Sequence, residues 1–158
     1  MNTKRLEDIR NVFGMVFVLA QRWQHLGDIE LANEGITTKQ WLLLVTISNL
    51  FDDPPNLNEL TLAYGGSRQN VKQLALNLEK RGFLEIYQDT SDRRVLRFKV
   101  TEECDQFWNA RKELDIQFIE GLFEDVAADG LMNTSSILSQ LMQITDVKLS
   151  LTPTGLKE

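Results

Sequence analysis

The fold is decided by residues 67–101, which read SRQNVKQLALNLEKRGFLEIYQDTSDRRVLRFKVT. The first half repeats its apolar residues at three- and four-residue steps, as a helix does, with Ser67 as the expected N-cap and Gly82 as the stop. After Gly82 the period changes to that of two strands, residues 83–87 and 95–100, separated by a polar turn with two arginines. This stretch therefore predicts a helix followed by a β-hairpin with a basic tip.

A short helix is expected directly before this stretch. Asn56 or Asn58 caps it, and it covers residues 59–64. It ends at Gly65-Gly66, because a helix that continued through both glycines would lose about 1 kcal/mol at each. Two helices joined by a tight glycine turn form a helix-turn-helix unit, and a hairpin directly behind such a unit makes a winged helix.

Long helices are expected on both sides of this unit. Apolar spacing predicts them over these ranges: residues 3–26, 38–50, 101–128 and 133 onward, the last after a break at Asp129-Gly130. Thr37 or Thr38 is the expected cap of the helix over residues 38–50, and Thr101 is the expected cap of the helix over residues 101–128. The fold class predicted is mainly α, a winged helix-turn-helix with a small β-hairpin wing and long flanking helices. Four regions are expected: an N-terminal helix and connector (1–36), the winged helix-turn-helix (37–100), C-terminal helices (101–148) and a flexible tail (149–158).

The charge distribution matters more than the total charge. The chain of 158 residues has a net charge of −6, which by itself argues against nucleic acid as a partner. Residues 56–101, however, contain eight basic and five acidic residues, a local charge of +3, which leaves −9 on the remainder. A basic segment inside an acidic chain keeps nucleic acid open as a partner.

Several function classes lack their motifs. One cysteine, Cys104, and one histidine exclude an internal disulfide and a zinc finger. The longest apolar run, residues 16–20, is far shorter than the roughly 20 residues that span a bilayer, and the N-terminus does not have the pattern of a secretory signal. A nucleophile elbow, a phosphate-binding loop and a dinucleotide fingerprint are all missing. We expect a cytoplasmic protein that is not an enzyme and uses no metal, cofactor or membrane.

The helix after Ser67 has an apolar face for the core and a polar face. The polar face and its N-terminal flank present Arg68, Gln69, Asn70, Lys72, Gln73, Asn77 and Lys80. Asparagine and glutamine pair with adenine edges, and arginine and lysine pair with guanine, while a helix N-terminus with the Ser67 hydroxyl suits a phosphate. Any surface helix has such a pattern, so this helix alone does not decide the function. Leu76 lies on the polar side, where either a thymine methyl group or another helix would accept it.

The hairpin favours DNA. Arg93 and Arg94 lie at its expected tip, next to Asp92, which can hold one guanidinium in place. Arginine in a narrow minor groove is a common mode of shape readout. We therefore expect the helix and the hairpin tip to bind double-stranded DNA together.

The winged-helix segment resembles the MarR family of bacterial transcriptional regulators in residues 67–74, 78–84, 92–94 and 100–101. The resemblance implies a homodimer held by its N- and C-terminal helices, usually a repressor on a palindromic operator. It also implies a recognition helix in the major groove and an Asp-x-Arg wing pair, here Asp92 and Arg94, at the minor groove. Residues 102–104 depart from the family, which often has Pro and Gly there; only the start of the following helix is affected.

The flanking helices are expected to form a dimer interface. Their apolar surface exceeds what a winged helix needs for its own core, and a twofold interface would match operator half-sites about 10 bp apart. Packing into a larger single core is the alternative. The resemblance also implies a small aromatic or anionic effector in a crevice, for which Trp23, His25 and Trp41 are candidates; the simpler interpretation is two core tryptophans and a solvated histidine. Acidic neighbours disfavour a thiolate at Cys104, so we expect it to be inert.

These observations predict a sequence-specific transcriptional regulator, a homodimeric repressor on a palindromic operator that a small effector releases. Two alternatives remain open at this point. One is a winged-helix adaptor that binds proteins, and the other is a small-molecule sensor that does not act through DNA.

Overall fold

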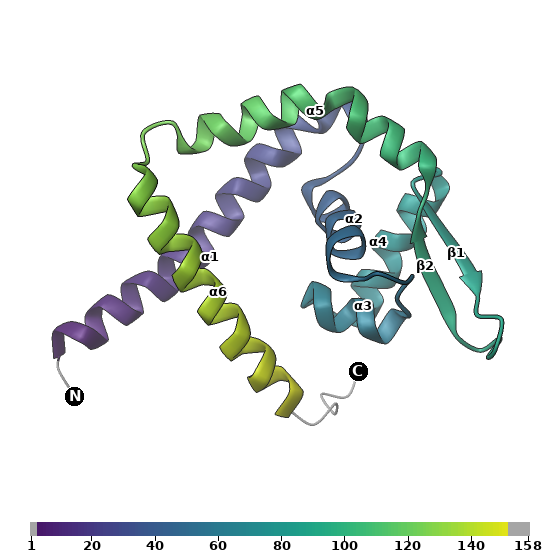
Figure 1. Cartoon of the computed structure of the whole chain (residues 1–158), viewed down its shortest axis with the longest axis horizontal. Helices are drawn as coiled ribbons and strands as arrows, with labels where there is room; N and C mark the ends of the chain where they lie inside the picture. The colour runs from purple at the N-terminus through teal and green to yellow at the C-terminus, as the bar shows by residue number, and fades with distance from the viewer. Residues whose placement is uncertain (1–2, 152–158) are drawn as a thin grey trace. The chain divides into compact units, whose positions relative to one another are not determined.

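The computed structural model describes residues 3–151, which are mainly helical with one two-stranded sheet (Figure 1). The elements in chain order are α1 (Thr3–Glu30), the 3-10 helix η1 (Ala32–Glu34), α2 (Thr38–Leu50), α3 (Leu57–Tyr64), α4 (Arg68–Lys80), β1 (Leu84–Gln88), β2 (Leu96–Val100), α5 (Glu102–Phe123) and α6 (Ala128–Leu151). The predicted fold class, a winged helix-turn-helix with long flanking helices, is confirmed. The chain divides into two compact units, residues 1–110 and 111–158.

Local capping signals explain where the two helices of the helix-turn-helix unit begin. Asn56 caps α3, because its side-chain oxygen accepts hydrogen bonds from two backbone N–H groups. The Glu59 carboxylate in turn accepts a hydrogen bond from Asn56 N at 2.7 Å, which completes a capping box. Ser67 caps α4, where its hydroxyl oxygen accepts from Asn70 N at 3.2 Å. Gly65 ends α3 with a φ of 74°, a left-handed conformation that favours glycine.

The core lies between α2, α3, α4 and the hairpin. Its fully buried large side chains include Leu43 of α2, Leu60 of α3, Leu78 of α4 and Phe98 of β2. Each contributes roughly 1.5–3 kcal/mol by leaving water. The apolar face predicted for α4 is confirmed: Val71, Ala75 and Leu78 are buried and Leu74 packs against the core from a half-buried position. This packing turns the polar face of α4 outward.

The hairpin is attached to the chain segment that leads into α3. Its strands are antiparallel, with Leu84 opposite Val100 and Gln88 opposite Leu96. On its other edge β2 makes an isolated bridge between Arg97 and Asn56, and Phe98 N donates to Pro55 O at 3.1 Å. We use "wing" for residues 84–100, the two strands and the turn between them. The wing is therefore held on both edges of β2.

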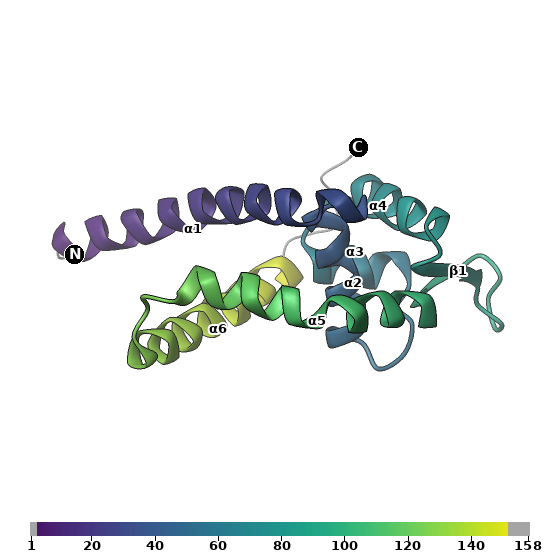
Figure 2. The same ribbon diagram turned by 90° about the horizontal axis from the view of Figure 1, so that it is seen from above.

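Helix α1 extends as a long rod from the winged helix (Figure 2). It is longer than predicted, and Gly27 is its buried residue. Close by, Thr38 donates its hydroxyl to Gln24 O at 3.0 Å and its backbone N–H to Asp28 Oδ1 at 2.7 Å. The C-terminal end of α1 is thereby fixed to the start of α2.

The predicted break between the last two helices was wrong. Helix α5 ends at Phe123, and Asp129-Gly130 lies in the first turn of α6. Backbone N–H groups of a first turn have no helical partner, and the helix dipole favours an acidic residue there, so this pair begins a helix as readily as it ends one. Helix α6 runs to Leu151, inside the expected tail of 149–158, and residues 152–158 lie outside the described part of the chain.

The three long helices α1, α5 and α6 expose apolar side chains. Phe13 and Phe17 of α1 are 67% and 61% exposed, and their rings meet edge to face with centroids 5.0 Å apart. In α6, Met132 and Met142 are also well exposed. No helix within residues 3–151 is long and apolar enough to cross a membrane.

Candidate nucleic-acid interface

The polar face of α4 is accessible along its length. The residues singled out from the sequence, Arg68, Gln69, Asn70, Lys72 and Gln73, are exposed, and Asn77 is half-buried. Gln73 donates its amide N–H to Asn77 Oδ1 at 3.1 Å, so these two amides are aligned along one face. The face presents amide groups and cations, which are the groups that pair with base edges and phosphates.

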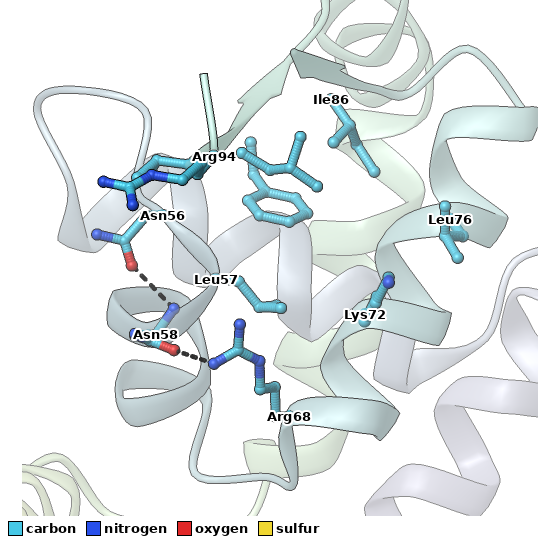
Figure 3. A pocket seen from close by; sticks show the side chains of 11 residues that line it. Asn56, Leu57, Asn58, Arg68, Lys72, Leu76, Ile86 and Arg94 are labelled. Carbon is cyan, nitrogen blue, oxygen red and sulfur yellow. Dashed lines mark hydrogen bonds between the residues drawn. The ribbon is translucent and has the colours of Figure 1, made fainter. Parts of the chain in front are cut away.

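The start of α4 is organised by a side chain of α3. Arg68 Nη1 donates to Asn58 Oδ1 at 2.7 Å, and Asn58 N in turn donates to Asn56 Oδ1 at 2.8 Å (Figure 3). An amide partner fixes the Arg68 guanidinium without neutralising its charge. The cation therefore remains available to an anion at the N-terminus of the helix.

The wing tip carries the arginine–carboxylate pair predicted from the sequence. Arg94 Nε and Nη2 each donate to one oxygen of Asp92 at 3.0 Å, and Arg94 N also donates to Asp92 Oδ1. These hydrogen bonds hold the pKa of Asp92 below its ordinary value and raise the pKa of Arg94. The Arg94 side chain is still 90% exposed, so it is oriented but accessible. Arg93 is exposed beside it.

A second arginine–carboxylate pair, at the base of the turn, was missed by sequence reasoning. Asp89 Oδ2 accepts from Arg97 Nε at 2.7 Å, and Asp89 Oδ1 accepts from the backbone N–H and hydroxyl of Ser91 and from Asp92 N. The Ser91 hydroxyl, followed by the Arg97 guanidinium, holds the pKa of Asp89 far below its ordinary value. Aspartate two residues before a serine is a local turn signal. That Arg97, eight residues later, is the partner of Asp89 could be predicted only from the register of the two strands.

A groove separates α4 from the wing (Figure 3). It has a volume of about 350 Å³, and its apolar lining consists of Leu57, Leu76, Ile86, Val95, Leu96 and Phe98. Its polar lining consists of Asn56, Asn58, Arg68, Lys72 and Arg94. Leu76, the apolar residue on the polar side of α4, is half-buried and faces this groove. Cations from α4 and from the wing thus border one groove, and its lining includes no acidic side chain.

The candidate effector residues do not line this groove. Trp41 of α2 packs against the core, whereas Trp23 and His25 of α1 are exposed. Their role as effector ligands stays a prediction. Cys104 is fully buried, and burial raises the pKa of its thiol to about 11, which agrees with the inert thiol expected.

Comparisons with known proteins agree on one class. No protein-family model matches the sequence. The chain is 34% identical over 77 residues to the transcriptional repressor MprA of Escherichia coli K12, a match that covers 49% of this chain and 44% of that protein. The chain therefore matches less than half the length of its curated relatives.

Solved structures with the same fold cover most of the chain. A MarR protein from Peptoclostridium difficile has a TM-score of 0.75 at 18% identity, over 87% of this chain and 89% of that one. The regulator BldR from Sulfolobus solfataricus has a TM-score of 0.73 at 16% identity, over 89% and 99%. BpsR from Bordetella bronchiseptica, whose DNA binding is regulated by 6-hydroxynicotinic acid, has a TM-score of 0.70 at 15% identity, over 83% and 92%.

These structures establish the fold, that of winged-helix regulators of the MarR type. The chain thus has the fold of MarR-type regulators, and over 77 residues its sequence is similar to that of a transcriptional repressor. The named relatives are transcriptional regulators rather than enzymes.

Proposed function

We propose that this protein is a transcriptional regulator that binds double-stranded DNA through α4 and the wing. The observation that carries the proposal is the shared groove: Arg68 and Lys72 of α4 and Arg94 of the wing border it together. A surface of this kind, cationic on two neighbouring elements, matches a DNA backbone that passes between a major and a minor groove. The similarity to a transcriptional repressor supports the same conclusion.

Each element has its own role in this proposal. Helix α4 has 13 residues, about 20 Å at 1.5 Å per residue, and fits the major groove with its N-terminal half toward the bases. Ser67 and the free N–H groups of that terminus contact a phosphate. The major-groove contacts, either to base edges or to the flanking phosphates, come from the polar residues of α4: Arg68, Gln69, Asn70, Lys72, Gln73 and Asn77. Arg93 and Arg94 enter the minor groove, with Asp92 holding Arg94.

A second copy of the chain is proposed to cover the exposed apolar side chains of the long helices. Two winged helices related by a twofold axis would meet a palindromic operator, in keeping with a repressor. An aromatic acid is the proposed class of effector, because 6-hydroxynicotinic acid regulates DNA binding by BpsR, which has the same fold. Trp23, His25 and Trp41 are the candidate contacts. Such a regulator works in the cytoplasm, where the DNA is.

The test is a titration of the purified protein against the promoter region upstream of its own gene, followed by gel shift at physiological salt. Specific retardation that an unrelated competitor DNA does not abolish is expected. Absence of retardation would favour the protein-binding adaptor. Calorimetry with aromatic acids, with and without the promoter DNA, separates a sensor that does not act through DNA from an effector-released repressor.

A further inference from the structure

We propose that Asp89 and Arg97 are positioning residues of the wing, which orient Arg94 for DNA without touching the DNA themselves. The inference rests on the proposed function and assigns a role to two charged residues that sequence reasoning left out. It follows from how each residue distributes its hydrogen bonds.

Asp89 divides its two oxygens between the tip and the base of the wing. Oδ1 accepts from Ser91 N at 2.8 Å, from the Ser91 hydroxyl and from Asp92 N at 3.2 Å, which fixes the backbone of the turn. Asp92, placed in this way, holds the guanidinium of Arg94 with both of its own oxygens. Oδ2 of Asp89 binds Arg97 on the opposite strand. The orientation of Arg94 therefore depends on Asp89 through Asp92.

Arg97 connects this turn to the start of α3. Besides Asp89, its guanidinium donates to Pro54 O at 3.2 Å and lies 3.6 Å from Glu59 Oε2. Glu59 also belongs to the capping box of α3. The Arg97 side chain is only 30% exposed, against 90% for Arg94, so its position is set within the protein. Arg97 thereby fixes the wing relative to the helix-turn-helix unit.

The sign of the effect distinguishes positioning from simple charge. Asp89 is a negative charge on a face proposed to bind phosphates, so general electrostatics predicts tighter DNA binding when that charge is removed. Positioning predicts weaker binding. Asp89→Asn is the informative variant, because asparagine has one uncharged acceptor oxygen and therefore cannot hold both the turn and Arg97 as the two carboxylate oxygens do.

Arg97→Lys provides a second variant on the other side of the pair. Lysine keeps the positive charge but lacks the planar fork that reaches Asp89 and Pro54 together. A purely electrostatic role of Arg97 would leave DNA affinity nearly unchanged in this variant. Glu85→Gln is the matched control, because Glu85 is an exposed acid on β1 for which no such network exists in the described hydrogen bonds.

The experiment measures operator affinity over a range of salt concentrations for the wild type, D89N, R97K, E85Q, R94A and the double variant D89N/R94A. We expect D89N and R97K to bind about tenfold more weakly, E85Q to bind at least as tightly as the wild type, and D89N to have little further effect in the R94A background. Thermal unfolding measurements check that each variant is folded. If D89N does not fold, the comparison of R97K with the wild type tests the inference.

Three results would overturn the inference while leaving the proposed function intact. These are unchanged or tighter binding by both D89N and R97K, a loss of the same size for D89N with and without Arg94, or an equal loss in E85Q. Failure of the wild type itself to bind the operator would instead remove the proposed function, and the inference with it.

Discussion

Arg94 and Arg97 lie three residues apart and have opposite environments. Arg94 is held by a carboxylate of its own turn and is almost fully exposed. Arg97 contacts the turn, the segment before α3 and α3 itself, and is mostly covered. Both form an arginine–carboxylate pair, so pairing alone does not distinguish them. The exposure that remains after pairing is what leaves Arg94 available for the proposed DNA contact.

Replacing Arg94 with alanine is expected to weaken operator binding by about tenfold and to make the salt dependence shallower by about one unit of slope, because one phosphate-directed cation is lost. Fluorescence anisotropy titrations at several salt concentrations measure both quantities. Lys99→Ala, an exposed cation on β2 outside the groove lining, is the control and should change the affinity less. Equal losses in the two variants would contradict a specific role for Arg94.

The depressed pKa of Asp89 predicts how the stability of the protein depends on pH. An acid whose pKa is lower in the folded than in the unfolded state stabilises the fold fully above its unfolded pKa, about 3.9, and loses that contribution as the pH falls toward the folded value. D89N lacks this contribution. The difference in thermal unfolding midpoint between wild type and D89N should therefore be constant near neutral pH and shrink below about pH 4. A difference that stays constant into the acid range would contradict the network around Asp89.

At the scale of the elements, the junction between α1 and α2 offers a test with an internal control. A Cβ atom at Gly27 would lie 2.5 Å from Thr38 Oγ1, whereas one at Gly14 meets nothing within 4 Å. Gly27→Ala is expected to destabilise the protein by about 1–3 kcal/mol, because Thr38 must move and give up its bond to Gln24. Gly14→Ala should stabilise it by up to about 1 kcal/mol through helix propensity. Urea unfolding measures both changes, and the same sign for both would show that this contact is not tight.

Elements with local signals could be predicted from the sequence, and those that depend on distant residues could not. Asn56 and Ser67 predict where α3 and α4 begin, respectively, because a cap acts within three residues of itself. The Asp92–Arg94 pair was predictable for the same reason. The bond between Asp89 and Arg97 needs the strand register, and the contact of Arg97 with Pro54 needs the tertiary fold. The break at Asp129-Gly130 was misplaced, because the same dipeptide suits a helix end and a first turn.

At the scale of the whole molecule, the exposed aromatic pair on α1 offers a test of the proposed dimer. Phe13 and Phe17 lie outside the core of the winged helix, so replacing both with glutamate should leave that core folded while preventing a second copy from covering them. If the wild type is the proposed dimer, we expect F13E/F17E to elute as a monomer in light-scattering chromatography and to bind the operator DNA more weakly than the wild type. Gln21→Glu, at another exposed position on α1, is the control and should elute like the wild type. A wild type that is itself monomeric would contradict the proposal.

The attachment of the wing to the start of α3 has a consequence for protein engineering. A hairpin is usually treated as a unit that can be exchanged between related proteins, and residues 84–100 have the appearance of such a unit. Two of the groups that orient this hairpin, the carbonyl of Pro54 and the carboxylate of Glu59, are supplied from roughly forty positions earlier in the chain. A graft of the hairpin alone would carry Arg94 to its new host but leave Arg97 without these acceptors. A transplant that is to keep the orientation of the hairpin must therefore include residues 54–59 as well.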